Sequence, residues 1–219
     1  MAYIDLYKAR EELVVFLRNK NILTTAQRGV TTKTDKFNGD GVTVDFSLTP
    51  LSGSVRNVRT VTVNSIMVSF GSGYKVNYST GVVTLATAPA AGTDNVEIQY
   101  DYGTGDKIFP DFPRSDLTLS SFPRIGVDII SAETTPGGHG NVHITNILFS
   151  VIVQDDKTKT ISDYGSAIRK AFITARNSFY YLGLVIPKSI GPLILSPNKS
   201  DKIMQQNFDF DSRFNFEIN

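Results

Sequence analysis

The two histidines, His139 and His143, are the residues of this chain best suited to bind a metal or transfer a proton. Their i, i+4 spacing would direct both imidazoles at one metal ion only if the segment were a helix. Gly138 and Gly140 flank the first histidine, and a run of β-branched residues contains the second. The pattern therefore predicts one loop histidine and one strand histidine, and no metal site.

Two pairs of neighbouring acids are the next candidates for chemistry, Glu11–Glu12 and Asp155–Asp156. General acid–base catalysis needs carboxyl groups that converge in a cleft. The first pair lies in a predicted helix and the second in a polar turn that also contains lysines, so we expect both pairs on a solvated surface. No Ser/His/Asp trio has support from neighbouring residues either. The sequence predicts no catalytic residue, and hence a protein that is not an enzyme.

Glycine-rich segments at 39–41, 71–73 and 137–140 share only their glycine content with phosphate-binding loops. None follows a strand and opens a helix, as a phosphate-binding loop requires. We interpret them as hairpin turns within β structure. Asp40 and neighbouring loop oxygens could contact calcium, but they provide too few ligands for a calcium loop. No cofactor and no bound metal are expected.

Tyrosines clustered in the same part of the chain allow two interpretations. They could form an aromatic platform for sugar binding, or they could be cross-strand pairs that stabilise a small sheet. The second interpretation is favoured. The residues are Tyr74, Tyr78, Tyr100 and Tyr102.

Composition excludes several classes of protein. The 219 residues include no cysteine, which excludes disulfide scaffolds and cysteine-based zinc sites. The 22 basic residues nearly balance the 21 acidic ones, and no segment has the basic excess of a nucleic-acid-binding module. No apolar run approaches the roughly 20 residues that span a bilayer. The first residues, 1–6, contain an early acid and no apolar segment, so no signal peptide is expected.

The first third of the chain is predicted to be a helix followed by β structure. Apolar residues cluster on one side of residues 3–20, which indicates an amphipathic helix. A polar linker is expected at 24–35. Short β runs separated by Gly, Pro, Asn and Asp then fill residues 37–102 and predict a small all-β sandwich or barrel, which we bound at 33–105. An irregular segment with prolines at 110, 113 and 123 leads out of it.

The remaining chain is predicted to be α+β. Strands are expected at 124–130 and 143–153, with a flexible loop at 134–141 between them. Apolar residues at i, i+3 and i+4 predict a helix over 163–181, capped by Ser162 or Asp163 and stopped at Gly183. Short edge strands are expected within 185–195, because two prolines interrupt that segment.

The last residues alternate strictly between apolar and polar side chains, which predicts one long strand with a buried and a solvated face. The apolar set is Phe208, Phe210, Ser212, Phe214, Phe216 and Ile218. We expect an antiparallel sheet packed against one or two helices. Residues 1–32 and 106–219 would form this α+β body, and residues 33–105 would be a β-sandwich inserted in it.

The β segment resembles a small sandwich that recurs in tail and neck proteins of tailed bacteriophages. That family has the pattern F-x-G-D-G-x-T-x-x-F-x-L, then V-x-V-N, then G-Y-x-V with spaced G, V, L, P-A, G and Y. The resemblance covers about a third of the chain. The matching residues are Phe37, Gly39, Asp40, Gly41, Thr43, Phe46, Leu48, Tyr74, Val76, Gly81, Val83, Pro89, Gly92 and Tyr100.

The other two-thirds is similar in layout to tail terminator (tail completion) proteins. These have an N-terminal helix, a β-hairpin sheet, a central amphipathic helix and a final strand pair, in the order predicted here. The family has no fixed motif, and its smallest members lack the β insertion.

The resemblance implies a structural virion protein that assembles in the host cytoplasm and resides in the tail or neck. It would form a homo-oligomeric ring, usually a hexamer, on the last ring of the tail tube protein. The ring would join the tube to the head–tail connector, and DNA would pass through its lumen without specific binding. Two alternatives stay open: another neck or tail part, such as a head-closure, adaptor or tube protein, and a glycan-binding module that uses the tyrosines.

Overall fold

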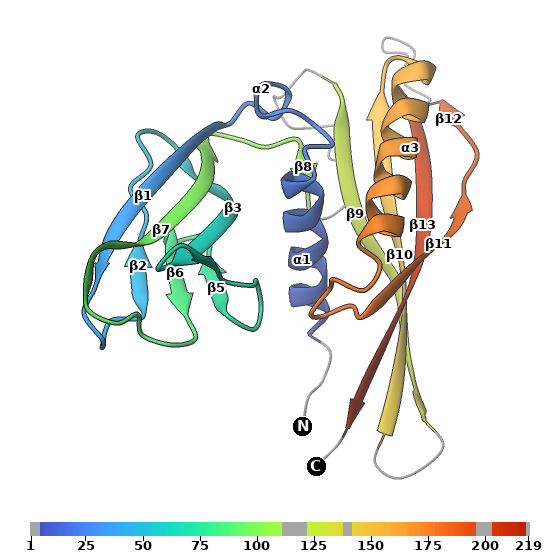
Figure 1. Cartoon of the computed structure of the whole chain (residues 1–219). Helices are drawn as coiled ribbons and strands as arrows, with labels where there is room; N and C mark the ends of the chain where they lie inside the picture. The colour runs from blue at the N-terminus through green and yellow to red at the C-terminus, as the bar shows by residue number, and fades with distance from the viewer. Residues whose placement is uncertain (1–4, 111–121, 138–141, 196–202, 218–219) are drawn as a thin grey trace. The chain divides into compact units, whose positions relative to one another are not determined.

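The computed structural model describes residues 5–110, 122–137, 142–195 and 203–217 (Figure 1). It is rich in antiparallel β structure and contains three helices. The chain divides into two compact units. We name the units by their order in the sequence: Leu23–Asp106 is the inner unit, and Met1–Ile22 together with Lys107–Asn219 is the outer unit.

The inner unit begins earlier than the linker prediction allowed. Residues 24–35 are not a linker, because they contain helix α2 (Thr25–Arg28) and the start of strand β1 (Thr31–Gly39). Thr24 and Gln27 form a reciprocal capping box, and Gly29 ends the helix at a φ of 75°. A capping box satisfies two backbone N–H groups that a four-residue helix would otherwise leave unpaired. Its Thr and Gln are polar, so the segment has the composition of a linker.

Two antiparallel sheets build the inner unit. The first has the order β1-β7-β3-β4 and the second the order β2-β6-β5. The remaining strands are β2 (Asp45–Ser47), β3 (Ser54–Val63), β4 (Ile66–Met67), β5 (Tyr74–Asn77), β6 (Val82–Leu85) and β7 (Gly92–Gly103). Both sheets contribute to one buried cluster, which includes Phe46, Val58, Val83, Ile98 and Tyr100.

Two glycine-rich turns connect strands of different sheets, so the hairpin prediction for them is wrong. Residues 39–41 lead from β1 to β2, and residues 71–73 lie between β4 and β5. Gly41 and Gly71 have φ values of 82° and 84°, a region in which side chains with a Cβ are disfavoured. These two glycines allow the backbone to turn where the chain changes sheet. Of the third segment only Gly137 is described: its N–H donates to the Val142 carbonyl, between the antiparallel partners β9 and β10.

One sheet and two helices build the outer unit. The sheet order is β11-β13-β10-β9-β8, with β12 also paired to β13. Helices α1 and α3 lie on the same face of the sheet (Figure 1). The bounds are α1 (Leu6–Asn19), β8 (Ile108–Phe109), β9 (Arg124–Pro136), β10 (Val142–Asp155), α3 (Thr158–Thr174), β11 (Leu184–Ile190), β12 (Ile194–Leu195) and β13 (Met204–Glu217).

An aromatic cluster holds the helices to the sheet. Phe172 of α3 is fully buried, and its ring centroid lies 4.5 Å from that of Phe210 and 4.8 Å from that of Phe16. Phe149 stacks on Phe210 at 5.2 Å and also contacts Phe172. Strand β13 thus directs Phe208 and Phe210 at the helices, as the alternation predicted. Helices on a largely antiparallel sheet are confirmed, and the strand-rich chain is consistent with an α+β or a mainly-β fold. Strands β8 and β9 are a parallel pair.

Helix α3 begins and ends earlier than predicted. It starts at Thr158 because the chain turns directly after β10, where the Asp155 carboxylate accepts the N–H of Lys157. Ser162 and Asp163 are not caps and lie within the helix, and Asp163 pairs with Lys159 at 2.6 Å. The helix ends at Thr174, and the buried Phe179 belongs to the following turn. The apolar spacing continues into this turn, which explains the late end that we predicted.

The strands of the outer unit are longer than predicted. Strand β9 continues to Pro136, so the expected loop at 134–141 is strand over its first three residues, and 138–141 lie outside the described residues. Strand β11 lies at one edge of the sheet, as the prolines predicted. The side chains of 215–219, including Phe216 and Ile218, also lie outside the described part.

Candidate functional site

His143 lies in β10, where its backbone pairs with Phe216 of β13 and Pro136 of β9. His139 lies outside the described residues. Among the residues that the structure describes, no three His, Cys, Asp or Glu side chains gather where they could hold a metal ion. In the same residues, no helix is long and apolar enough to cross a membrane.

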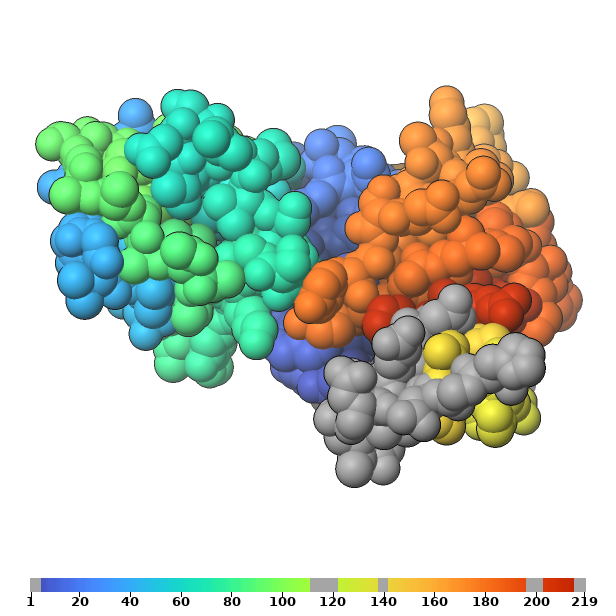
Figure 2. All heavy atoms as spheres, turned by 60° about the horizontal axis from the view of Figure 1, so that its bottom comes forward, coloured from blue at the N-terminus to red at the C-terminus, as the bar shows by residue number. Residues whose placement is uncertain are grey.

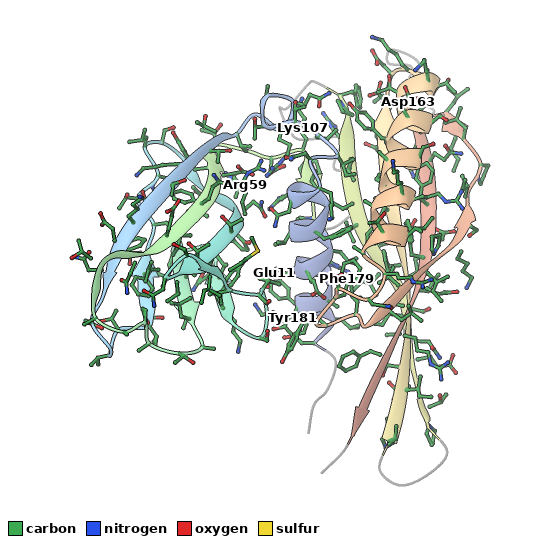
Figure 3. The ribbon with its side chains drawn as sticks, in the orientation of Figure 1. Glu11, Arg59, Lys107, Asp163, Phe179 and Tyr181 are labelled. Atoms are coloured by element: carbon green, nitrogen blue, oxygen red, sulfur yellow. The ribbon has the colours of Figure 1, made fainter. Side chains whose placement is uncertain are left out.

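Glu12 is buried, which overturns the prediction of a solvated Glu11–Glu12 pair. Its carboxylate accepts the backbone N–H of Tyr180 at 2.6 Å and of Tyr181 at 2.9 Å. Glu11 instead pairs with Lys8 at 2.7 Å. Glu12 therefore fixes the turn after α3 to α1, next to Phe179, whose ring packs on Phe16. Figure 3 labels Phe179 and Tyr181 of this turn and Glu11 of α1.

Burial raises the pKa of Glu12, and the hydrogen bonds from Tyr180 and Tyr181 oppose part of this effect. A carboxyl group whose pKa is higher in the folded state stabilises the fold most below its unfolded pKa, and that contribution is lost as the pH rises through the folded value. We expect the free energy of unfolding of the wild type, minus that of Glu12→Gln, to fall as the pH rises from 4 to 7. Urea unfolding at both pH values measures this, and a difference that grows with pH would contradict it.

Asp155 is also buried, so the prediction of a solvated acidic turn is wrong for this residue. Burial and the neighbouring Asp156 raise the pKa of its carboxyl group. Asp156 is exposed. The two carboxyl groups belong to the turn that begins α3, and neither lines the groove described below.

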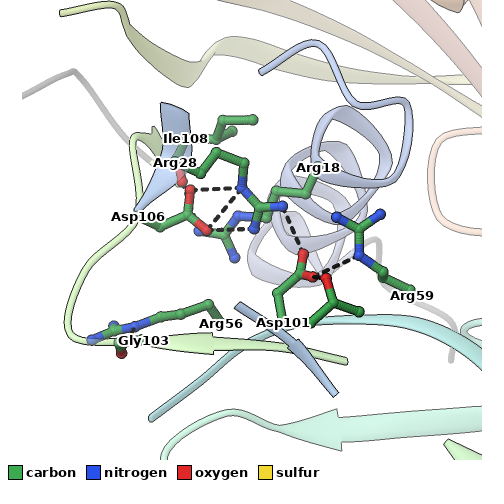
Figure 4. A network of polar contacts seen from close by, with 9 residues as sticks. Arg18, Arg28, Arg56, Arg59, Asp101, Gly103, Asp106 and Ile108 are labelled. Atoms are coloured by element: carbon green, nitrogen blue, oxygen red, sulfur yellow. Dashed lines mark hydrogen bonds and ion pairs between the residues drawn. The ribbon is translucent and has the colours of Figure 1, made fainter. Parts of the chain in front are cut away.

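A buried cluster of charged side chains lies in the inner unit, and sequence reasoning missed it. Arg28 at the end of α2 contacts the carboxylate of Asp101 at 2.7 Å and that of Asp106 through Nε and Nη2 (Figure 4). Arg59 Nε and the Thr32 hydroxyl donate to the second oxygen of Asp101, at 2.6 and 2.7 Å. Arg28 is 1% exposed. The cluster therefore ties the first residues of the inner unit to its last residues.

Burial alone would raise the pKa of Asp101, but hydrogen bonds from Arg59 and Thr32 and the charge of Arg28 hold that pKa below its ordinary value. The carboxylate stays ionised because each of its oxygens has a donor. Such an arrangement fixes two chain segments together. Its charges are paired with each other, so we interpret it as a structural joint.

Asp40 completes the turn between β1 and β2. Its carboxylate accepts the N–H groups of Val42 and Thr43, at 2.8 and 2.6 Å, and the Thr43 hydroxyl at 2.5 Å. These three donors are the hydrogen-bond pattern of an Asx turn. The carboxylate is thereby engaged by its own turn.

These hydrogen bonds, that of the Thr43 side chain first, lower the pKa of Asp40 to about 2. Thr43→Val removes the hydroxyl donor, so we expect the pKa to rise toward its ordinary value of 3.8. Titration of the Asp40 carboxyl carbon by NMR measures this. The same midpoint in both proteins would show that the hydroxyl does not stabilise the carboxylate.

The four tyrosines do not form an exposed platform. Tyr74, Tyr100 and Tyr102 are at most 7% exposed and belong to the core of the inner unit, and Tyr78 packs against that core. The Tyr100 hydroxyl donates to Asp35 at 2.9 Å. A sugar ring needs an exposed aromatic face for stacking, so the structure contradicts the platform interpretation of these residues.

A groove lies on the surface of the outer unit. It has a volume of about 460 Å³ and lies along α3 beside β11 and β13. Its lining residues are Ser162, Gly165, Ser166, Arg169, Lys170, Ile173, Thr174, Ile190, Gln206 and Phe208. Figure 2 shows α3 and the segment that follows it, in orange, on the open surface of the outer unit. The lining combines apolar, polar and basic side chains and contains no carboxylate.

Comparison with known protein families found no family whose model matches the chain, and comparison with curated proteins found no match either.

Proposed function

We propose that this chain is a structural virion protein of a tailed phage, a tail terminator that forms a ring on the end of the tail tube. It would bind the tail tube protein on one side and the head–tail connector on the other. Its place would be the tail or neck of the virion, after assembly in the host cytoplasm.

The observation that carries the proposal is a compact, mainly β unit, Leu23–Asp106, whose sequence interrupts that of a second unit with one largely antiparallel sheet and two helices. Two sheets around one core support the interpretation of the inner unit as an inserted β-sandwich. The outer unit has the element order of tail terminators: an N-terminal helix, a β-hairpin, a central helix and final strands.

The residues that carry the phage resemblance have structural roles in the inner unit. Phe46, Leu48, Tyr74, Val76, Val83 and Tyr100 are buried in its core. Asp40 caps a turn, while Gly41 and Gly81 have positive φ values. Because these residues shape the core and turns of the inner unit, they support a role in assembly.

Charge and surface also support a ring around DNA. The formal net charge is +1, so a lumen lined by this protein would attract phosphates weakly and let DNA slide. Subunits that repeat one heterologous contact around an axis close into a ring. A usual tail terminator has six subunits, and we propose a hexamer.

The alternative is another neck or tail part, such as a head-closure, adaptor or tube protein, that uses the inner unit at a different joint. The test is to add the purified protein to tubes assembled from the tail tube protein of the same phage. A tail terminator binds one end of each tube and stops further growth. Binding along the tube, or binding only to the head connector, would favour the alternative.

A further inference from the structure

The outer unit exposes apolar side chains along one edge of its sheet. Strand β11 is the edge strand, and no described strand pairs with its outer side. Ile190 of β11 is 48% exposed and Ile173 of the adjacent α3 is 53% exposed, and both line the groove. Ile186 is 50% exposed, but it pairs with Asp211 and so lies on the other face of the sheet. Leu195 of β12 pairs with Met204, on the same face of the sheet as Phe208, and is 65% exposed. A cluster of exposed large apolar residues at a sheet edge marks a surface for contact with another chain.

The groove along this edge is lined by both apolar and basic side chains. Ile173 and Ile190 line it, and Phe208 of β13 lies at its base next to Gly165. Arg169 and Lys170 also line it. We call this surface, with α3 and β11 as its walls, the basic edge. A complementary surface would bring an apolar side chain to the two isoleucines and a carboxylate to the two bases.

The same sheet carries such a surface on its other side. Strand β8 pairs with β9 only at Ile125 and Gly126, and no other described strand pairs with that side of β9. Residues 130–136 of β9 are all exposed. Ile130 is 52% exposed, and Glu133 lies three residues further along the strand. In Figure 1 this half of β9 extends with β10 beyond the ends of α1 and α3. We call residues 130–136 the acidic edge.

We propose that the basic edge of one copy binds the acidic edge of a second copy of this chain, and that this contact builds the ring. This inference rests on the proposed function and names the surfaces that would join neighbouring subunits. Ile130 would pack against Ile173 and Ile190, and Glu133 would pair with Arg169 or Lys170. The two surfaces lie on different strands, with β13 and β10 between β11 and β9, so the contact is heterologous and can close into a ring.

The contact would use side chains more than added backbone pairing. Pro187 has no N–H group, and a bulge between Pro187 and Ser189 interrupts the register of β11. A partner strand could therefore form few ladder hydrogen bonds with β11. Docking into the groove avoids this restriction and also limits uncontrolled strand addition at the edge.

Disulfide trapping tests the contact directly, because the chain has no cysteine of its own. Ser166→Cys places a thiol on the basic edge and would be combined in turn with Ser131→Cys, Glu133→Cys or Thr135→Cys on the acidic edge. Oxidation of at least one double variant should give a ladder of multimers that ends at the closed ring on a non-reducing gel. Neither Ser166→Cys alone nor Ser166→Cys with Ser72→Cys, an exposed position of the inner unit, should give a ladder.

The outcomes separate this inference from the proposed function. Dimers from Ser166→Cys alone would show an isologous contact and overturn the inference. Rings of the wild-type protein without a ladder from any of the three double variants would also overturn it, while the proposed function would stand. A wild-type protein that stays monomeric, alone and with tubes, would refute both.

Charge exchange provides a second, independent test. Glu133→Lys and the double variant R169E/K170E should each weaken self-association on the order of ten- to a hundredfold, because like charges would then face each other. The triple variant should recover most of that loss. Sedimentation velocity over a concentration series measures the association. If the loss of self-association in the triple variant equals the sum of the two separate losses, the proposed pairing of these residues is overturned.

Discussion

Replacing Phe172 by alanine is expected to lower the free energy of unfolding of the outer unit by about 3–5 kcal/mol, the usual cost of truncating a fully buried phenylalanine. Phe172 has no exposed surface, and its ring contacts those of Phe16, Phe149, Phe179 and Phe210. The variant leaves a cavity where α1, α3 and the sheet meet. Amide hydrogen exchange in β10 and β13, followed with and without urea, reports this loss for the outer unit separately.

The adjacent residue provides a matched control. Ile173 is 53% exposed, so Ile173→Ala should change the stability of the monomer by no more than about 0.5 kcal/mol. It should nevertheless weaken self-association, because Ile173 lines the groove of the basic edge. A loss below about 1 kcal/mol for Phe172→Ala would contradict the account of the core, since large-to-small changes at closely packed sites cost more.

Replacing Arg28 by alanine is expected to destabilise the inner unit by about 3–5 kcal/mol, because the change leaves buried carboxylates without their partner. Asp101 has no exposed side-chain surface and Asp106 has 5%, so water cannot replace the guanidinium group. Arg28→Lys should recover only part of the loss, since an ammonium group cannot reproduce the fork that contacts both acids. Hydrogen exchange in β1 and β7 measures the effect on this unit.

The control for Arg28 is Lys36→Ala, which removes an exposed ion pair with Glu97 at 3.9 Å and should cost no more than about 0.5 kcal/mol.

The cost of Arg28→Ala should depend on pH with a definite sign. The pKa of Asp101 is lower in the folded state, so its contribution is present above the ordinary value of 3.8 and is lost as the pH falls through the folded value. Arg28→Ala should therefore cost less at pH 2 than at pH 6. An equal cost at both values would contradict the assignment of an ionised pair.

The sequence predicted the elements whose own side-chain pattern shows which face is buried. Strict alternation in β13 located a long strand with Phe208 and Phe210 on the buried face, because a strand with period two has only one way to bury such a set. The turn residues of the inner unit predicted its β structure, because they separate short β runs and act through neighbouring residues. They did not show which strands share a sheet, since that depends on pairing between distant segments such as β1 and β7.

The buried charges could not be predicted, because their partners are remote in the sequence. Arg28 and Asp101 are separated by 73 residues, and Glu12 and Tyr180 by 168. A charged residue in a polar stretch or on a helix is exposed in most proteins, and only a paired one is buried. Local signals could have revealed α2: Thr24 and Gln27 have the spacing of a capping box, and Gly29 follows as a stop. The open edges of the outer sheet likewise depend on strand order and not on local pattern.

The measurement that tests the central claim most directly is electron microscopy of the purified full chain at high concentration, together with native mass spectrometry. The account predicts closed rings with six-fold averages, a central hole wide enough for duplex DNA and a mass of six chains of 24.1 kDa. Monomers at every concentration, both alone and with tubes, or dimers with two-fold symmetry, would contradict a ring-forming tail terminator.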